Sequence, residues 1–301
     1  MSNNNIIKGV FLVALGATSY GMLATFVKLA YKEDFTTAEV TSSQFIYGII
    51  GILIINLFQR TKNKNTAVKA TPKNIMHLML AGTSLGMTSV FYYLAVKHIP
   101  VSIGIVLLMQ TVWMGVLLEW FLDKKAPSAQ KIISVIIVLI GTALAINIFK
   151  IDFNDPTIDW SNGLFWGLLA AASFTTTMFT ANKVALGISS AQRSLYMLLG
   201  GAVIVFGFSL YTQVTPFNFE IFTKWGIVLA LFGTIIPPML LNAGFPHTGI
   251  GLGSIVSSLE LPVSVMMAYF LLNEQVLLIQ WIGIVLIITA IVIMNIQIKK
   301  K

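Results

Sequence analysis

The acidic residue Glu260 lies in the middle of a long apolar stretch. Residues 250–272 contain no other charged side chain. An ionised carboxylate at the centre of a membrane-spanning helix costs about 2.5–3.5 kcal/mol on insertion scales, so it usually faces a cavity or a partner. The position therefore predicts a proton carrier or a binding group for a substrate ammonium. The alternative is a structural acid beside a kink at Pro262, where the helix lacks a backbone donor.

Polar and aromatic residues also occur in other apolar stretches. Gln110 and Trp113 are one helical turn apart and share a helix face. A few convergent polar groups in an apolar pocket suit a small polar ligand. The same groups can instead join helices or anchor them at the membrane interface. The candidates for lining a cavity are Gln110, Trp113, Tyr92, Tyr93, Gln44, Tyr47 and Asn242.

Lys28 lies late in the first apolar stretch and has two interpretations. It either extends its ammonium to the outer interface or faces the cavity and binds a carboxylate. Glu119 is expected to reach the opposite interface or to pair with Lys124 or Lys125. Three prolines predict kinks, which act either as hinges or only as packing relief: Pro237, Pro238 and Pro262.

The composition shows what kind of elements carry these residues. Hydrophobic residues make up 56% of the 301 positions and charged residues only 10%, whereas about 25% is usual for a soluble domain. A chain with so little polar surface is not a soluble domain. A membrane helix needs about 20 apolar residues. Ten such stretches are found, at 9–30, 38–58, 75–96, 99–122, 129–149, 163–182, 190–211, 224–244, 250–272 and 277–297.

Charge placement predicts the orientation of these ten spans. With the N-terminus in the cytoplasm, the even-numbered loops and the C-terminus collect lysine and arginine, and the other loops are mostly acidic. Both termini are therefore expected in the cytoplasm, in the cytoplasmic (inner) membrane. The net charge of +8 then reflects membrane topology, and no nucleic-acid partner is expected.

The two halves of the chain show a weak internal repeat. A shift of 150 residues brings Gln110 onto Glu260 and Gln130 onto Gln280. Near the start of each half, residues 17–20 (Ala-Thr-Ser-Tyr) resemble residues 171–174 (Ala-Ala-Ser-Phe). Five helices per half would invert the second half relative to the first, a recurring plan of secondary transporters, which bind substrate near the midplane between the halves.

Several other classes lack their signatures. There is no phosphate-binding glycine loop, no zinc-protease or nucleophile-elbow motif, and no cysteine. We expect no enzyme activity, no metal and no cofactor, although a membrane-embedded transferase stays open as an alternative. The expected partners are a small-molecule substrate, the lipid bilayer and, if transport is coupled, protons.

The second half also contains a family motif. It reads Leu259-Glu260-Leu261-Pro262-Val263, then Asn273-Glu274, then Gln280-Trp281-Ile282-Gly283. This resembles the EamA-type repeat of the drug/metabolite transporter superfamily, and Asp123-Lys124-Lys125 with Gln130 resembles it more weakly. The resemblance covers residues 9–149 and 163–297. It implies an all-α integral membrane protein of ten helices in two inverted five-helix repeats. In that arrangement helices 1–4 and 6–9 line a central cavity.

The resemblance also implies a function. The chain is similar to exporters of small metabolites, amino acids or drugs. We therefore expect it to export amino acids or related compounds by alternating access. The chain departs from the family pattern at Asn273, where glycine is usual, and at Gln110. The alternative cargo is a phosphate-bearing, nucleotide-sugar-like metabolite. It would need cations, for which Lys28, Lys183 and Arg193 are the candidates.

Overall fold

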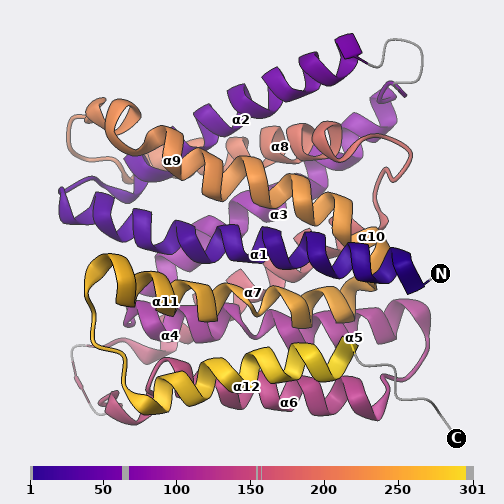
Figure 1. The fold of residues 1–301 in the computed structure, drawn as a ribbon. Helices are drawn as coiled ribbons and strands as arrows, with labels where there is room; N and C mark the ends of the chain where they lie inside the picture. The colour runs from indigo at the N-terminus through magenta and orange to yellow at the C-terminus, as the bar shows by residue number, and fades with distance from the viewer. Residues whose placement is uncertain (1–2, 63–67, 154, 157, 296–301) are drawn as a thin grey trace, which may run out of the picture.

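Long apolar helices make up nearly all of the chain in the computed structural model, which describes residues 3–62, 68–153, 155, 156 and 158–295. They lie roughly along one axis (Figure 1). In chain order they are α1 (Asn3–Lys32), α2 (Thr37–Lys62), α3 (Pro72–Val96), α4 (Val101–Leu108), α5 (Thr111–Asp123), α6 (Ala129–Ala145), the 3₁₀ turn η1 (Ile148–Lys150), α7 (Trp160–Lys183), α8 (Ser190–Thr212), the π-helical η2 (Phe222–Gly226), α9 (Ile227–Ala230), the π-helical η3 (Leu231–Ile235), α10 (Ile236–Ser257), α11 (Glu260–Leu272) and α12 (Leu278–Asn295).

Eight helical segments in the described residues are long and apolar enough to cross a bilayer. Many of their large apolar side chains point outward, including Leu210, Phe121 and Val203. Such an exterior suits lipid and not water, so the chain is an integral membrane protein. The shorter α6 has 17 residues and is also apolar. The last two residues of the expected repeat, 296 and 297, lie outside the described residues.

A single helical segment, 222–272, contains two of the expected spans, 224–244 and 250–272. Its interior residue Gly249 has φ +76° and ψ 174°, a conformation that glycine adopts without a Cβ clash. Gly244 packs near the start of α1, at Gly9, and Glu260 packs further along it, at Gly21. The chain therefore reverses direction at Gly249: α10 begins antiparallel to α1, and α11 runs parallel to it (Figure 1).

Two helical runs are broken near their middle, at Met109–Gln110 and at Ser258–Leu259. In each break, backbone N–H groups donate to carbonyls three residues earlier and not four. The bonds of the first break are Gln110 to Leu107 and Val112 to Met109, and those of the second are Leu259 to Val256 and Leu261 to Ser258. The helices after the breaks end at left-handed residues, Lys124 and Asn273. Each feature of the second break repeats the first at an offset of 149 residues.

This offset corrects the pairing that the sequence suggested. A shift of 150 aligns Gln130 with Gln280, but the breaks align Thr111, and not Gln110, with Glu260. The second half has one more residue than the first between the left-handed helix end and the glutamine, Asn273 to Gln280 against Lys124 to Gln130. The loops 124–128 and 273–277 have equal length, so the glutamine lies one position later in α12 than in α6.

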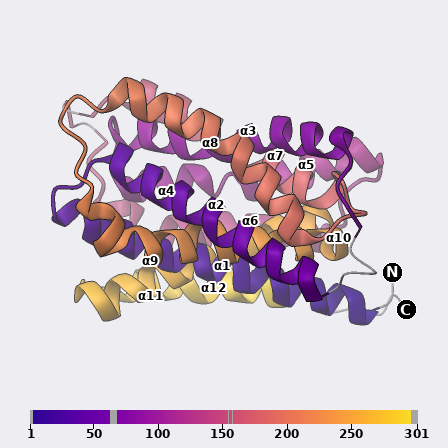
Figure 2. The same ribbon diagram turned by 90° about the horizontal axis from the view of Figure 1, so that it is seen from above.

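The helices of the two halves pack in corresponding pairs. The most extensive contacts join α1 to α10 and α3 to α7 and α8. Helices α6 and α12 cross antiparallel at Gly141 and Gly283, where each backbone lies close to the other. From above, α11 and α12 lie on the side of the bundle opposite α8 and α3 (Figure 2). Helix α1 begins and α12 ends at the same end of the bundle (Figure 1).

Candidate functional site

A cavity of about 600 Å³ lies inside the bundle, between helices of both halves. We call its open side the mouth end; it is the left end in Figure 1, where α1 and α11 end. At this end the cavity is bordered by Lys28 and Glu274, which are 51% and 42% exposed and form an ion pair with each other. The deep part of the cavity is lined by Tyr20, Gln44, Tyr92, Phe174, Thr234 and Glu260.

Glu260 is the first residue of α11, directly after the helix break, and it is half-buried against the cavity. Helix α1 approaches it closely, since an ideal Cβ on Gly21 would lie 2.5 Å from the Glu260 carbonyl oxygen. The phenol groups of Tyr20 and Tyr92 lie within electrostatic reach of its carboxylate. In the described residues, the carboxylate of Glu260 has no hydrogen-bond or ion-pair partner.

Aromatic rings line the same cavity as this carboxylate. Tyr20 and Phe174 meet edge to face, with ring centroids 6.2 Å apart at 81°. Tyr92 and Tyr93 also meet edge to face, with centroids 5.9 Å apart at 67°. Tyr31 lines the cavity nearer to the mouth end. In the described residues, the deep cavity therefore combines one carboxyl group with several aromatic rings.

Five of the predicted site residues line the cavity together: Glu260, Tyr92, Tyr93, Gln44 and Lys28. Gln44 is buried, and its side chain packs against Gly233 of the segment η3. Its backbone carbonyl accepts a hydrogen bond of 2.9 Å from the Thr234 hydroxyl. The structure thus places a side-chain amide beside the apolar wall that α2 and η3 form.

Gln110 and Trp113 are not among the described residues that line the cavity. The Trp113 indole donates to the Gln110 side-chain oxygen at 2.8 Å, and the Gln110 amide donates to the Val106 carbonyl at 3.0 Å. These bonds satisfy polar groups at the α4–α5 break. Trp113 also borders a separate groove on the outer face, together with Thr176 of α7.

Tyr47 and Asn242 also lie away from the cavity. The Tyr47 ring packs edge to face against Phe222, with centroids 5.5 Å apart. The Asn242 side chain is buried and donates to the Ser194 hydroxyl at 2.9 Å, which joins α10 to α8. Both residues make contacts between helices.

Comparison with known proteins identifies the family. The model of the EamA-like transporter family matches the chain twice, over residues 7–147 and 161–296. The chain belongs to the EamA-like transporter family. This is a family of transporters and not of enzymes, so the chain is a membrane transporter with a small-molecule substrate.

Solved structures show the same fold. A crystal structure with 13% sequence identity superposes with a TM-score of 0.77, over 96% of this EamA-like transporter and 97% of the other chain. It is one of 28 solved chains that match. No curated protein matches the sequence significantly.

The structure places the three prolines of the EamA-like transporter near changes of helix geometry. Pro237 and Pro238 lie in the first turn of α10, directly after the π-helical η3. Pro262 is buried and lies three residues after the break at Ser258–Leu259 ends. Whether they act as hinges stays a prediction.

Two important aromatic residues of the cavity, Tyr20 and Phe174, were not among the sequence candidates. A signal for them exists, because they are the last residues of the two similar four-residue segments 17–20 and 171–174. In the EamA-like transporter the two rings contact each other. Residues that correspond in the two repeats therefore meet inside the cavity.

The end opposite the mouth is packed, and we call it the closed end. A buried apolar cluster fills the bundle there: Val13, Phe174, Met178, Ala181, Leu241, Phe245, Ile250, Leu252 and Val256. Phe174 belongs both to this cluster and to the cavity wall. The cavity of the EamA-like transporter is thus open toward the mouth end and sealed by apolar side chains toward the closed end.

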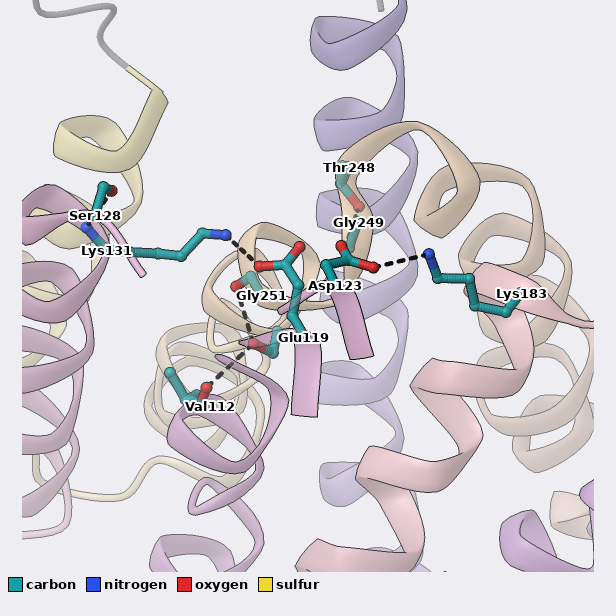
Figure 3. A network of polar contacts seen from close by, with 10 residues as sticks. Val112, Glu119, Asp123, Ser128, Lys131, Lys183, Thr248, Gly249 and Gly251 are labelled. Atoms are coloured by element: carbon teal, nitrogen blue, oxygen red, sulfur yellow. Dashed lines mark hydrogen bonds and ion pairs between the residues drawn. The ribbon is translucent and has the colours of Figure 1, made fainter. Parts of the chain in front are cut away.

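Ion pairs lie at the surface of the closed end (Figure 3). Glu119 pairs with Lys131, and not with Lys124 or Lys125 as the sequence suggested, because α6 brings Lys131 alongside α5. An ideal Cβ on Gly251 would lie 2.5 Å from a Glu119 carboxylate oxygen. The carboxylate therefore lies over the start of the helical stretch after Gly249, where the positive end of the helix dipole favours an anion.

Proposed function

We propose that this EamA-like transporter is a secondary transporter that exports amino acids or related compounds, drugs included, by alternating access. One observation carries the proposal: a cavity of about 600 Å³ that is open at one end only and that, among the residues the structure describes, contains a single carboxyl group in its deep part. Cavities of about 300–1,000 Å³ suit small ligands. A sealed closed end means that the cavity does not form a continuous channel.

We further propose ten membrane spans in two inverted repeats, residues 9–149 and 163–297. The paired breaks at an offset of 149 residues support two equivalent halves. The packing supports inversion, because α1 packs on α10 as α3 packs on α7, and α6 crosses α12 antiparallel. Gly249 supports counting the segment 222–272 as two spans.

The proposed location is the cytoplasmic (inner) membrane, with both termini in the cytoplasm. The closed end, where α1 begins and α12 ends, also carries Lys124, Lys125 and Lys131. Lysine and arginine favour the cytoplasmic side. The mouth end then faces outward, as expected for the releasing state of an exporter.

Glu260 is the proposed proton-coupling or amine-binding group. It lines the cavity at the break, and the titratable side chains that face it are the phenols of Tyr20 from α1 and Tyr92 from α3. We propose Gln44, Tyr93 and Lys28 as further lining groups. Pro237, Pro238 and Pro262 are the proposed hinges, since each adjoins a π-helical turn or a break.

The observations disfavour a phosphate-bearing cargo. Lys28 is the one lysine or arginine among the described lining residues, and it pairs with Glu274. Arg193 is 2% exposed and donates only to backbone carbonyls, and Lys183 pairs with Asp123 at 3.4 Å. A phosphate group requires clustered cations, which this cavity does not offer.

Counterflow in proteoliposomes tests the proposal. Vesicles are preloaded with a mixture of amino acids, amines and sugar phosphates, and uptake of each labelled compound is followed. We expect exchange of amine-bearing compounds and none of sugar phosphates. Exchange of sugar phosphates alone would support the alternative cargo, and no exchange by folded, inserted protein would contradict a transporter of these classes.

A further inference from the structure

One acidic side chain of the cavity has no cationic partner among the described residues. Three charged side chains line it in the described part of the chain: Lys28, Glu260 and Glu274. Lys28 and Glu274 neutralise each other at the mouth, where both are about half exposed. The carboxylate of Glu260 remains without a cationic partner in the deep part. An incoming cation therefore meets one carboxyl group that can serve as its counter-ion.

The aromatic side chains reinforce this preference. Tyr20 and Tyr92 lie within electrostatic reach of Glu260, and Phe174 and Tyr93 extend the aromatic wall on either side. The face of an aromatic ring attracts an organic cation through its quadrupole, most strongly where water is excluded. A carboxylate among aromatic rings thus provides both parts of a site for an ammonium group with an apolar body.

Among the described residues, the same cavity offers a carboxylate or phosphate of the ligand neutral donors but no unpaired cation. At the break before α11, the N–H groups of Ser258, Leu259 and Leu261 already donate to earlier carbonyls. Lys28 is already paired with Glu274. A zwitterionic amino acid would find neutral donors such as Gln44 and Ser89 for its carboxylate but no cationic partner, and burying a charge without an opposite charge is costly.

We propose that the cavity selects organic monocations, amines and quaternary ammonium compounds with an apolar or aromatic body, over the corresponding zwitterionic amino acids. The proposal rests on the transport function proposed above and narrows its substrate class. Selection arises from Glu260 together with the rings of Tyr20 and Tyr92, and not from the paired charges at the mouth.

A matched pair of substrates tests this selectivity. Tyramine and tyrosine differ only by the carboxylate, so labelled tyramine and labelled tyrosine are compared in counterflow with the full chain in proteoliposomes. We expect tyramine to exchange about tenfold faster or more, because its ammonium gains a partner and no carboxylate is left unpaired. Unlabelled benzyltrimethylammonium, which carries a permanent charge, is expected to compete with tyramine.

The outcomes separate the two proposals. Tyrosine exchange that equals or exceeds tyramine exchange overturns the cation preference and leaves the transport function standing. The absence of exchange for every compound overturns both. Failure of benzyltrimethylammonium to compete also overturns the preference, since the site would then accept only the neutral amine.

Variants locate the selectivity in the cavity. We expect Glu260→Gln to lower tyramine exchange about tenfold, to the level of tyrosine, because the negative charge is lost. The control Glu220→Gln makes the same chemical change outside the cavity, at an exposed residue paired with Lys224, and should change nothing. An unchanged tyramine preference in Glu260→Gln would overturn the assignment.

Aromatic variants provide a second readout if Glu260→Gln fails to fold. Tyr92→Phe keeps the ring and should keep competition by benzyltrimethylammonium. Tyr92→Leu removes the ring and should weaken that competition about fivefold, in line with a cation–π contribution. Equal competition in the two variants would contradict a role for the ring.

Discussion

Arg193 illustrates how a single charged residue can be structural in this fold. Its guanidinium donates to the carbonyl oxygens of Val184, Asn242, Thr180 and Ala181, at 2.6–3.0 Å. These carbonyls lie at the end of α7 and within α10, so one side chain joins three helices. The sequence showed a cation near the membrane surface, but it did not show that backbone carbonyls would surround it.

Replacing this residue should destabilise the protein. We expect Arg193→Gln to lower the free energy of unfolding by about 3 kcal/mol or more, because hydrogen bonds to a charged group contribute about 1.5–3 kcal/mol each and buried carbonyls lose their donors. Thermal unfolding in detergent measures the change. Arg60→Gln, at an exposed position in α2, should have little effect. Equal stability of the two variants would contradict the structural role.

The ion pair at the mouth should behave differently. Lys28 and Glu274 are both about half exposed, and exposed pairs contribute at most about 1 kcal/mol to stability. We expect Lys28→Gln to leave unfolding nearly unchanged and to lower the apparent KM for tyramine about twofold or more, since Glu274 then adds negative potential at the entrance. A raised KM would indicate that Lys28 binds substrate directly.

Glu260 should determine any proton coupling. If it is the proton carrier, Glu260→Gln should abolish the pH dependence of net flux and leave exchange measurable, because exchange needs no net proton movement. The measurement is net efflux from loaded vesicles at about pH 6 and about pH 8, on either side of neutral, because a proton-transfer group works best with a pKa near the operating pH. A full pH response in the variant would move the role to another residue.

Among the elements, the turn at Gly249 depends most directly on its residue type. Its φ of +76° is a conformation that side chains rarely adopt, and a Cβ there would lie 2.7 Å from a Glu119 carboxylate oxygen. We expect Gly249→Ala to lower the free energy of unfolding by about 1–3 kcal/mol. Gly207→Ala serves as the control, because nothing lies within 4 Å of its Cβ position and alanine favours a helix.

The helix breaks show where sequence reasoning reached its limit. The stretches around 99–122 and 250–272 were expected as membrane helices, and the structure has helices there. The break at Met109–Gln110 was not expected, because no glycine or proline interrupts the chain at that point. Tertiary packing against α7 and α10 holds the bend, and such packing has no local signature.

The candidate site could be predicted only in part, because the sequence does not show which face of a membrane helix points into the cavity. A lone glutamate in an apolar stretch is visible in any sequence, and Glu260 does line the cavity. Polar residues such as Gln110 and Asn242 give the same signal whether they face a cavity or another helix. Only the rotation of each helix separates the two cases, and weakly amphipathic membrane helices leave that rotation undetermined.

For the molecule as a whole, the closed end is where the proposed transport cycle must open. The pairs Glu119–Lys131 and Asp123–Lys183 join α5 to α6 and to α7 at that end (Figure 3). Such ion pairs change the balance between the two transport states only if they form in one state and not in the other. They should therefore favour the state that is open at the mouth.

Removing one pair should shift this balance. The chain contains no cysteine, so Ser89→Cys places a single thiol in the cavity wall for labelling from the mouth end. We expect Lys131→Gln in that background to slow labelling about twofold to fivefold, as the loss of about 1 kcal/mol changes the ratio of states. Lys125→Gln, at an exposed position, is the control, and identical labelling in both would contradict a latch at Lys131.

The unlike chemistry of the two ends has a thermal consequence. The closed end is sealed by apolar side chains, whereas the mouth is bordered by tyrosines and an ion pair. Opening the closed end would hydrate more apolar surface than closing the mouth removes, and so would carry a positive heat-capacity change. Apolar burial weakens on cooling. The balance between the two states should therefore shift toward opening of the closed end in the cold, and a van't Hoff plot of that balance should be curved.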